Sequence, residues 1–485
     1  MKGQHILLIA LIYFLFLLFI AKITGKNDNN NDFFKANRKS KWYVVAFGMI
    51  GASLSGVTFI SVPGWVGSSE FSYFQVCLGY VAGYIFVALF LLPIYYKLNL
   101  TSIYEYLYGR FGKVSHRTGA FFFLISRVLG AAFRMYLMAI VLQQFVFEQW
   151  EIPFEATVII SILLIWVYTN KGGIKTIVWT DTLQTLFMIC AVILSINIIT
   201  DELGWSFNEF LNSNELESYS DIFKTENFLD KDYFLKSFFG GMFITISMTG
   251  LDQDMMQKNL TCRSLKDAQK NMLFFSIILT IVTFLFLLLG ALLFIYTERY
   301  GIKIPLMDGK PTTDLLFPEI AINSGLGSLL SGTFILGLIA AAYSSADSAL
   351  TSLTTSFCVD ILNFKNYNFD RKKSIRKLTH IGMSLVLAIV VISFKYFANK
   401  NVIDSLLTVA GYTYGPLLGL FSFGIFTNYK IKDNLVWIVS LASVLLVYTI
   451  GQIPPKFIGG YILGYELLPL NGFITFLGLI LIRRY

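Results

Sequence analysis

Residues 338–353 read LIAAAYSSADSALTSL and place four serines, one threonine and one aspartate within an otherwise apolar run. At helical spacing, Ser344, Asp347 and Ser348 stand at positions i, i+3 and i+4 and therefore share one helix face. Hydroxyl and carboxylate oxygens suit a hard cation such as Na⁺. Serines that bond back to their own helix are the alternative, but it gives no reason to bury Asp347 at a cost of roughly 2.5–3.5 kcal/mol. The pattern favours a cation site inside a membrane helix.

The composition is that of an integral membrane protein. Of the 485 residues, 55% are hydrophobic and 14% are charged, and the mean hydropathy is +0.65, whereas a soluble domain carries about 25% charged residues. The formal charge of +8 is spread over short segments between apolar runs. These basic segments reflect the membrane topology of the chain and do not indicate a nucleic-acid-binding surface. The four cysteines stand far apart without a CxxC pair, which indicates neither a metal cluster nor a disulfide framework.

Apolar runs long enough to cross about 30 Å of hydrocarbon recur along the whole chain. They predict an all-α membrane protein, a single polytopic domain over residues 1–485, with about thirteen transmembrane helices. The expected spans lie near 5–23, 42–68, 71–96, 117–145, 153–170, 176–200, 235–257, 271–297, 325–362, 377–397, 404–427, 434–452 and 467–482.

The charges of the loops predict the orientation. Lys and Arg gather in alternate loops such as 22–41, 97–117, 258–270 and 365–377, whereas the intervening segment 201–234 is rich in Asp and Glu. Basic short loops remain on the cytoplasmic side of a membrane. We therefore expect a multi-pass protein of the plasma (inner) membrane, with the N-terminus outside and the C-terminus in the cytoplasm.

The stretch GMIGASLSGVTFISVPGW, residues 48–65, interrupts an early span with glycines, hydroxyl residues and Pro63. Gly and Pro make it easy to open the backbone hydrogen-bond ladder of a helix, and the freed carbonyls can coordinate a cation at the bilayer midplane. Close helix packing through small residues explains the same composition. Taken alone, the stretch is compatible with both interpretations.

The stretch IVWTDTLQTLFM, residues 177–188, carries Asp181 and Gln184 near the start of a span. A carboxylate at a helix end is by default hydrated at the membrane interface. The alternative is that Asp181 faces Ser344 and Ser348 and acts as a second cation ligand.

The stretch SRVLGAAFRMYLM carries Arg127 and Arg134 inside a span. Seven residues correspond to about 700° of helix rotation, so both guanidinium groups share one face at depths about 10 Å apart. Snorkelling to the interface rescues one of them but hardly both, which favours a polar cavity or paired carboxylates. An arginine at such a cavity is suited to hold a carboxylate substrate in bidentate geometry.

The sequence lacks a P-loop, a Ser/His/Asp set and a zinc-binding helix. We therefore expect neither an ATP-driven pump nor an enzyme. The expected partners are sodium ions, a small-molecule solute and the lipid bilayer, without nucleic acid and without an obligatory protein partner.

Taken together, these stretches resemble the sodium/solute symporter family, which contains sodium-coupled sugar, proline, iodide, multivitamin and sialic acid transporters. The resemblance covers essentially the whole chain. The most specific motifs are LPIYYKLNLTSIYEYLYGRFG (92–112), VWTDTLQT (178–185), LDQDMMQKNL (251–260), AAAYSSADSALTS (340–352) and GPLLGLFSFGIF (415–426).

The resemblance implies a leucine-transporter-like fold, in which five helices within about 42–200 are repeated upside down within about 235–427. The first span (about 5–23) and the last two (about 434–482) lie outside these repeats. The first helix of each repeat is expected to be broken near the membrane centre. The glycine-rich 48–56 and the stretch FFGGMFITISMTG (238–250) fit that expectation.

The resemblance also implies the positions of three sites. The main Na⁺ site falls on Gly51, Leu54, Ala341, Ser344 and Ser345. A possible second Na⁺ site uses Asp181, Ser344, Asp347 and Ser348, although position 347 is commonly Ser or Thr in the family. The substrate cavity is expected to be lined by Ser53, Ser55, Thr58, Tyr73, Cys77, Tyr80, Arg127, Thr245, Met248 and Ala410.

The implied function is that of a sodium-coupled secondary active symporter, which imports a small polar organic solute by alternating access. Sugar transporters tend to carry Glu or Gln where this chain has Cys77 and Ala410, which favours a carboxylate-bearing anion such as a monocarboxylate, a vitamin or a sialic-acid-like solute. Two alternatives stay open: a sodium/sugar or polyol symporter, and a proton-coupled carrier that uses Asp347 or Asp181.

Overall fold

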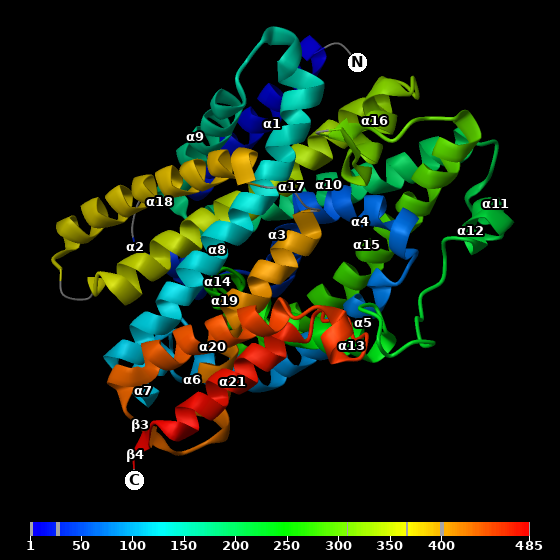
Figure 1. The fold of residues 1–485 in the computed structure, drawn as a ribbon. Helices are drawn as coiled ribbons and strands as arrows, with labels where there is room; N and C mark the ends of the chain where they lie inside the picture. Colours follow the sequence, from blue (N-terminus) through cyan, green and yellow to red (C-terminus); the bar gives the residue numbers. More distant parts are fainter. Residues whose placement is uncertain (1–2, 26–29, 308, 365–366, 398–401, 485) are drawn as a thin grey trace.

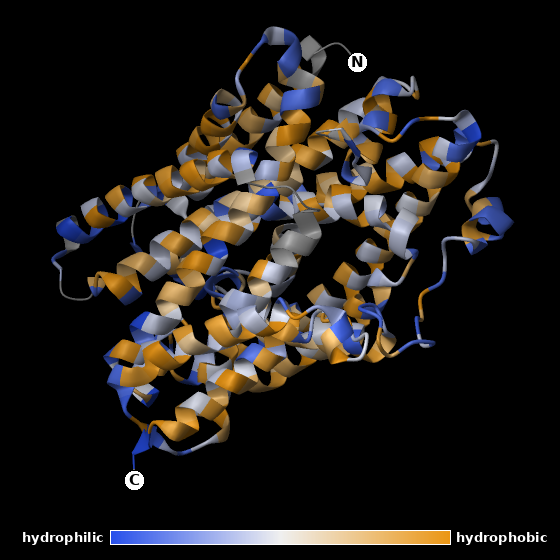
Figure 2. Ribbon diagram, viewed as in Figure 1, coloured by the Kyte–Doolittle hydropathy of each residue, from blue (hydrophilic) through white to orange (hydrophobic). Residues whose placement is uncertain are grey.

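The computed structural model describes residues 3–25, 30–307, 309–364, 367–397 and 402–484. Figure 1 shows a bundle of long helices with the two termini at opposite ends of the molecule. Hydrophobic residues cover the long helices, and hydrophilic residues gather at loops and helix ends (Figure 2). This distribution is that of a protein whose solvent is hydrocarbon around its middle and water at both ends.

The long helices account for most of the described chain. They are α1 (Gly3–Thr24), α5 (Tyr73–Phe86), α8 (Lys113–Leu142), α9 (Phe154–Gly172), α10 (Ile174–Glu202), α15 (Leu265–Tyr300), α17 (Ser328–Ser356), α18 (Phe369–Phe397), α19 (Val402–Phe426), α20 (Val436–Gly451) and α21 (Leu467–Leu481). Two further spans are broken: α3 (Trp42–Ser53) with α4 (Gly56–Ser69), and α13 (Phe234–Thr245) with the π-helical η5 (Ile246–Gly250) and α14 (Gln253–Asn259).

Short elements connect or extend these spans. The short helices are α2 (Asn30–Lys35), α6 (Leu92–Lys97), α7 (Glu105–Arg110), α11 (Phe207–Leu211), α12 (Asn214–Glu217) and α16 (Leu316–Asn323). Two antiparallel pairs of two-residue strands occur in loops: β1 (Leu306–Met307) with β2 (Lys310–Pro311), and β3 (Lys430–Ile431) with β4 (Arg483–Arg484).

The thirteen predicted spans all coincide with helices. The described residues contain nine apolar helices long enough to cross a membrane, or eleven when each bent pair is one span. Two shorter apolar helices, Leu8–Thr24 and Leu467–Leu481, match the first and last predicted spans. The all-α prediction is confirmed, with the two small strand pairs as the exception.

Both expected helix breaks are present. α3 and α4 differ in direction by 57°, and the pair from Phe234–Gly250 to Gln253–Asn259 differs by 68°. At the first break Leu54 leaves the helical conformation, with φ −73° and ψ 84°. At the second break Asp252 is extended, and its carboxylate caps α14 by accepting a hydrogen bond from the Asp254 backbone N–H at 2.7 Å. An aspartate at this position supplies the missing helix-start acceptor.

Helix α10 holds the first half of the broken span in place. Thr182 Oγ1 donates a hydrogen bond to the Val44 carbonyl at 3.0 Å, and Thr185 Oγ1 donates to the Phe47 carbonyl at 2.6 Å. Hydroxyl groups that bond to carbonyls of a neighbouring helix are a common way to join membrane helices. They fix α3 against the helix that carries Asp181.

Tyrosines of the 92–112 motif close the second break. Tyr95 donates its hydroxyl proton to the Gly250 carbonyl, and Tyr104 donates to the Leu251 carbonyl, both at 2.8 Å. These carbonyls lie where the helix direction changes and lack the continuous ladder of a straight helix. The motif therefore completes the backbone hydrogen bonds of the second broken span.

Helices α5 and α13 cross so closely that only glycine fits. A Cβ atom at Gly241 would collide with the carbonyl oxygen of Val76, whereas one at Gly382 of α18 would meet nothing within 4 Å. We predict that Gly241→Ala lowers the melting temperature of the detergent-solubilised protein, because overpacking of this kind costs roughly 1–3 kcal/mol. Gly382→Ala is the matched control and leaves the melting temperature equal or slightly higher. Equal melting curves for both variants would contradict the close crossing.

Candidate sodium and substrate sites

The first helix break leaves two backbone carbonyls without a backbone hydrogen-bond donor in the described part of the chain. In a continuous helix the Ser55 N–H would donate to Gly51, but it donates to Ser53 at 3.0 Å instead. Neither the Gly51 nor the Leu54 carbonyl accepts a backbone hydrogen bond from the part of the chain that the structure describes. Both residues are buried. Buried carbonyls without a partner are costly, and a cation is one group able to satisfy them.

Helix α17 faces this break with its hydroxyl groups. A Cβ atom on Gly51 would lie 3.3 Å from Ser344 Oγ, so the two helices approach closely at this level. Ser345 is completely buried, and its Oγ has no hydrogen-bond partner among the described residues. Its hydroxyl group does not donate a hydrogen bond to a carbonyl of its own helix, which was the alternative interpretation of serines at these positions. Four predicted elements of the main Na⁺ site, Gly51, Leu54, Ser344 and Ser345, thus offer buried oxygens, and Ala341 is buried one turn before Ser344.

Asp181 lies in the protein interior and not at the membrane interface. Its exposed fraction is 0%. Oδ1 accepts a hydrogen bond from Ser344 Oγ at 2.7 Å, as the cation-site interpretation requires. Oδ2 lies 2.7 Å from the ammonium group of Lys258, whose side chain is also fully buried. Lys258 is not among the residues that the sequence predicted for this site.

Asp347 is buried in the same region. Its Oδ2 accepts a hydrogen bond from the Tyr168 hydroxyl at 2.7 Å, while Oδ1 has no side-chain partner among the described residues. The charges of Asp181 and Lys258 both act on it. Ser348 Oγ is likewise buried without a partner in the described chain. Asp181 and Asp347 thus lie in the same buried region, where Ser344 bonds to Asp181 and Ser348 follows Asp347 along α17.

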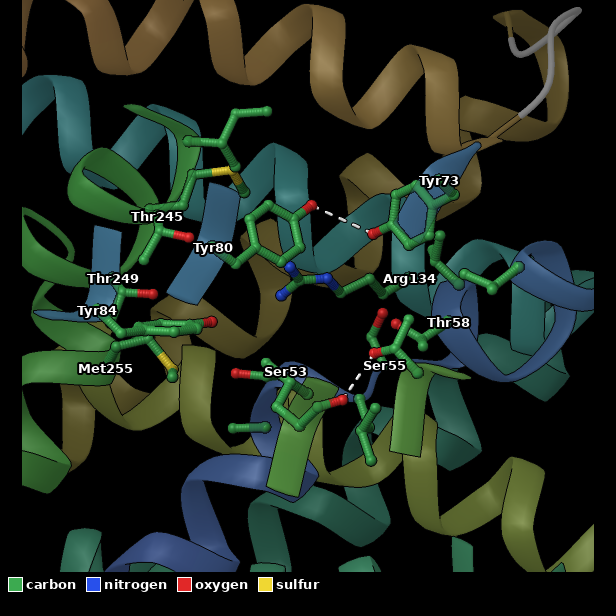
Figure 3. Close-up of a pocket in the computed structure, with 18 of the residues that line it drawn as sticks. Ser53, Ser55, Thr58, Tyr73, Tyr80, Tyr84, Arg134, Thr245, Thr249 and Met255 are labelled. Atoms are coloured by element: carbon green, nitrogen blue, oxygen red, sulfur yellow. Dashed lines mark hydrogen bonds between the residues drawn. The ribbon is translucent and has the colours of Figure 1, made fainter. Parts of the chain in front are cut away.

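A polar cavity adjoins the first break. Its volume is about 120 Å³, and Figure 3 shows hydroxyl groups from several helices directed into it. The polar residues that line it are Ser53, Ser55, Thr58, Tyr73, Tyr80, Tyr84, Arg127, Arg134, Thr245, Thr249 and Thr283, with Met248 and Met255 among the apolar ones. Tyr73 Oη and Tyr80 Oη lie 3.2 Å apart and form a hydrogen bond across one wall.

The two arginines of the cavity differ in their partners. Arg127 forms a buried ion pair with Asp254. Arg134 has no ion-pair partner in the described chain, and its Nε and Nη1 atoms have no hydrogen-bond partner there. Figure 3 shows the guanidinium group of Arg134 extending into the cavity. Among the described lining residues, the arginine without an ion-pair partner is therefore Arg134, whereas Arg127, the arginine predicted for the substrate site, is paired with Asp254.

Most of the predicted substrate-site residues meet at the cavity. Eight of them line it: Ser53, Ser55, Thr58, Tyr73, Tyr80, Arg127, Thr245 and Met248. Cys77 and Ala410 are buried but are not among the lining residues. Sequence reasoning missed Tyr84, Thr249 and Thr283, whose hydroxyl groups at helical spacing look like ordinary packing residues.

Comparison with known proteins places these features in a family. The model of the sodium:solute symporter family matches residues 33–433. The chain belongs to the sodium:solute symporter family. The symporter is 26% identical over 465 residues to the sodium/sialic acid symporter NanT of Aliivibrio fischeri, covering 93% of this chain and 88% of the relative. It is 25% identical over 424 residues to the human sodium-coupled monocarboxylate transporter 1, covering 84% and 66%.

A solved structure shares the fold of the symporter. A Na⁺-coupled sialic acid symporter matches 99% of this chain and 98% of its own with a TM-score of 0.84, at 20% sequence identity. This likeness confirms the leucine-transporter-like architecture. The protein is a multi-pass, sodium-coupled membrane transporter and not an enzyme, and Na⁺ is its coupling ion.

We predict that Ser345→Ala raises the half-saturating Na⁺ concentration for uptake about tenfold, because losing an oxygen that binds a charge costs about 1.5 kcal/mol. Uptake into proteoliposomes at varied Na⁺ measures this. Ser352→Ala is the matched control on α17, since Ser352 Oγ bonds back to the Ala349 carbonyl at 3.0 Å. Identical Na⁺ activation in the two variants would remove Ser345 from the site.

Proposed function

We propose that the symporter imports a small carboxylate-bearing solute together with Na⁺, and that Arg134 binds the carboxylate. The observation that carries this proposal is a buried guanidinium group without a partner in the described chain, directed into a cavity ringed by hydroxyl groups. A guanidinium fork matches a carboxylate in bidentate geometry. The sialic acid and monocarboxylate transporters among the relatives carry carboxylate solutes, which supports the same class.

The remaining cavity residues suit the rest of such a solute. No Asp or Glu belongs to the described lining of the cavity, so an anion meets no like charge there. Tyr73, Tyr80, Tyr84, Thr245 and Thr249 offer hydroxyl groups that both donate and accept hydrogen bonds. A solute with hydroxyl or amide groups beside its carboxylate fits this lining. A neutral sugar would leave the guanidinium of Arg134 without its counter-charge.

Na⁺ binding couples to solute binding through the first helix break. We place the main Na⁺ at the carbonyls of Gly51, Leu54 and Ala341 and the hydroxyls of Ser344 and Ser345. Ser53 and Ser55, which flank Leu54, line the solute cavity. A Na⁺ that fixes this break therefore also fixes two residues of the solute site, and by linkage the solute raises the affinity for Na⁺ to the same extent.

The free energy available for solute import depends on the number of Na⁺ ions that bind per transport cycle. A tenfold Na⁺ gradient supplies about 1.4 kcal/mol, and each charge moved through 100 mV supplies about 2.3 kcal/mol. One Na⁺ with a monoanion moves no net charge, so the membrane potential would contribute nothing. A second Na⁺ makes import electrogenic. The oxygen-rich region around Asp181 and Asp347 is where we place this second ion.

We infer the topology from the loops. The termini lie at opposite ends in Figure 1, as an odd number of spans requires. The basic alternate loops support an N-terminus outside and a C-terminus in the cytoplasm, in the plasma (inner) membrane. The repeats correspond to α3–α10 and α13–α19, each beginning with a broken span, with α1, α20 and α21 outside them.

The test is a binding panel that changes only the charge of the ligand. The panel pairs two carboxylates, the small lactate and the larger N-acetylneuraminate, with their neutral analogues, lactamide and the N-acetylneuraminate methyl ester. At least one carboxylate should raise the melting temperature in NaCl but not in choline chloride, because only ligands that bind the folded form stabilise it. Arg134→Gln should weaken that carboxylate more than 100-fold, since roughly 3 kcal/mol of charge-assisted bonding is lost.

The control is Arg117→Gln, which changes an exposed arginine on the same helix and should leave the affinity unchanged. Na⁺ alone should still stabilise Arg134→Gln. Equal binding of the neutral analogue, or normal carboxylate affinity in Arg134→Gln, would contradict the proposal and favour a sugar or polyol symporter. Solute uptake driven by a pH gradient without Na⁺ would favour a proton-coupled carrier.

A further inference from the structure

Lys258 places a positive charge at the carboxylate where the second ion was expected. It lies on α14, the C-terminal half of the second broken span, and its ammonium group is 2.7 Å from Asp181 Oδ2 on α10. Both side chains have an exposed fraction of 0%. Buried ion pairs persist because separating the charges would leave each one unpaired in a medium of low polarity. Asp181 is thus neutralised by a residue of the chain itself.

Asp347 has no ion-pair partner in the described chain, and Lys258 pairs with Asp181 instead. The described polar partner of Asp347 Oδ2 is the neutral Tyr168 hydroxyl, and Oδ1 has no side-chain partner in the described chain. The side chain is completely buried. A buried carboxylate of this kind requires a counter-charge.

Unpartnered oxygens gather beside Asp347. Ser348 Oγ and Thr351 Oγ1 are buried, and neither has a hydrogen-bond partner among the described residues. Thr351 stands one helical turn after Asp347, so the two side chains lie on one face of α17. Other hydroxyls of this helix, such as Thr354 and Thr355, bond back to the carbonyls of Leu350 and Thr351. Besides Ser345 of the main Na⁺ site, the free side-chain oxygens of α17 in the described chain are therefore those of Asp347, Ser348 and Thr351.

The charges of the cluster add up to minus one. Asp181 and Asp347 contribute two negative charges and Lys258 one positive charge. One monovalent cation makes the cluster neutral, whereas two would leave it positive. Since Lys258 has already neutralised Asp181, the cation is drawn to Asp347.

We propose that Lys258 is a tethered counter-ion for Asp181, and that Asp347 with Ser348 and Thr351 binds the second Na⁺ in its place. This inference rests on the proposed sodium-coupled function and specifies which residues hold the second ion. Lys258 and Asp347 then form a compensating pair: the lysine removes one anionic ligand, and the aspartate supplies another. Thr351 enters the site as a ligand, and Asp181 becomes a positioning residue that holds Lys258 and Ser344.

The test is a double-mutant cycle of Asp347→Ser and Lys258→Met. The number of Na⁺ ions per solute is measured from the ratio of charge to solute flux in proteoliposomes, together with the Hill coefficient of Na⁺-dependent thermal stabilisation without solute. We expect two Na⁺ ions in the wild type and one in Asp347→Ser. The double variant should regain the second ion, because Asp181 is then free to bind it. Thr351→Val should weaken the second Na⁺ about tenfold and leave the first unchanged.

Lys258→Arg with Asp347→Ser is the matched control, since it keeps the positive charge and should retain a single Na⁺. Asp347→Ser leaves the Lys258–Asp181 pair balanced, so it is expected to fold and decides the case even if the double variant does not. Two Na⁺ ions in Asp347→Ser, or a folded double variant that stays at one, would overturn the inference. A wild type that Na⁺ does not stabilise at all would instead refute the proposed sodium sites.

Discussion

Backbone groups in a membrane must find partners inside the protein, because hydrocarbon offers none. This constraint governs both broken spans. At the second break, the carbonyls of Gly250 and Leu251 accept hydrogen bonds from Tyr95 and Tyr104. At the first break, the Gly51 and Leu54 carbonyls receive no backbone donor from the described chain. The protein thus completes one break with its own tyrosines, and we propose that a transported Na⁺ completes the other.

The buried charged residues likewise divide into those that are paired within the protein and those that are not. Arg127 pairs with Asp254, and Lys258 pairs with Asp181. Arg134 stays without a partner at the solute cavity, and Asp347 retains an oxygen without a side-chain partner beside the ion sites. Within the described chain, Arg134 therefore offers a positive charge at the solute cavity, and Asp347 offers a free carboxylate oxygen beside the proposed ion sites. In the proposed mechanism, a solute anion at Arg134 and Na⁺ at Asp347 supply the missing counter-charges, and the binding of each favours the binding of the other.

Hydropathy predicted the thirteen spans, and the family resemblance, together with the glycine-rich stretches that fit it, predicted both breaks. The face shared by Ser344, Asp347 and Ser348 followed from helical spacing, and the structure places Asp181 against Ser344. Spacing alone left other points undecided. It put Arg127 and Arg134 on one face, but their difference depends on Asp254 of another span.

The contact of Lys258 likewise could not be predicted from helical spacing. This residue lies in a short motif that reads as an ordinary basic loop, and periodicity says nothing of its contact with Asp181 on a distant helix. Tyr84 and Thr249 escaped notice because hydroxyl residues on packed helices resemble core residues until a cavity is seen beside them. Properties of one helix were predictable, whereas pairings between helices required the fold.

The account depends on a Na⁺ ion held between the first helix break and α17. The most direct test is a pair of high-resolution cryo-EM maps of the symporter, one in NaCl and one in choline chloride. We expect a compact density peak between the Leu54 carbonyl and Ser345 Oγ in NaCl, and its loss in choline chloride. A region without such a peak in both maps, with the Leu54 carbonyl bonded to a protein donor instead, would contradict the account.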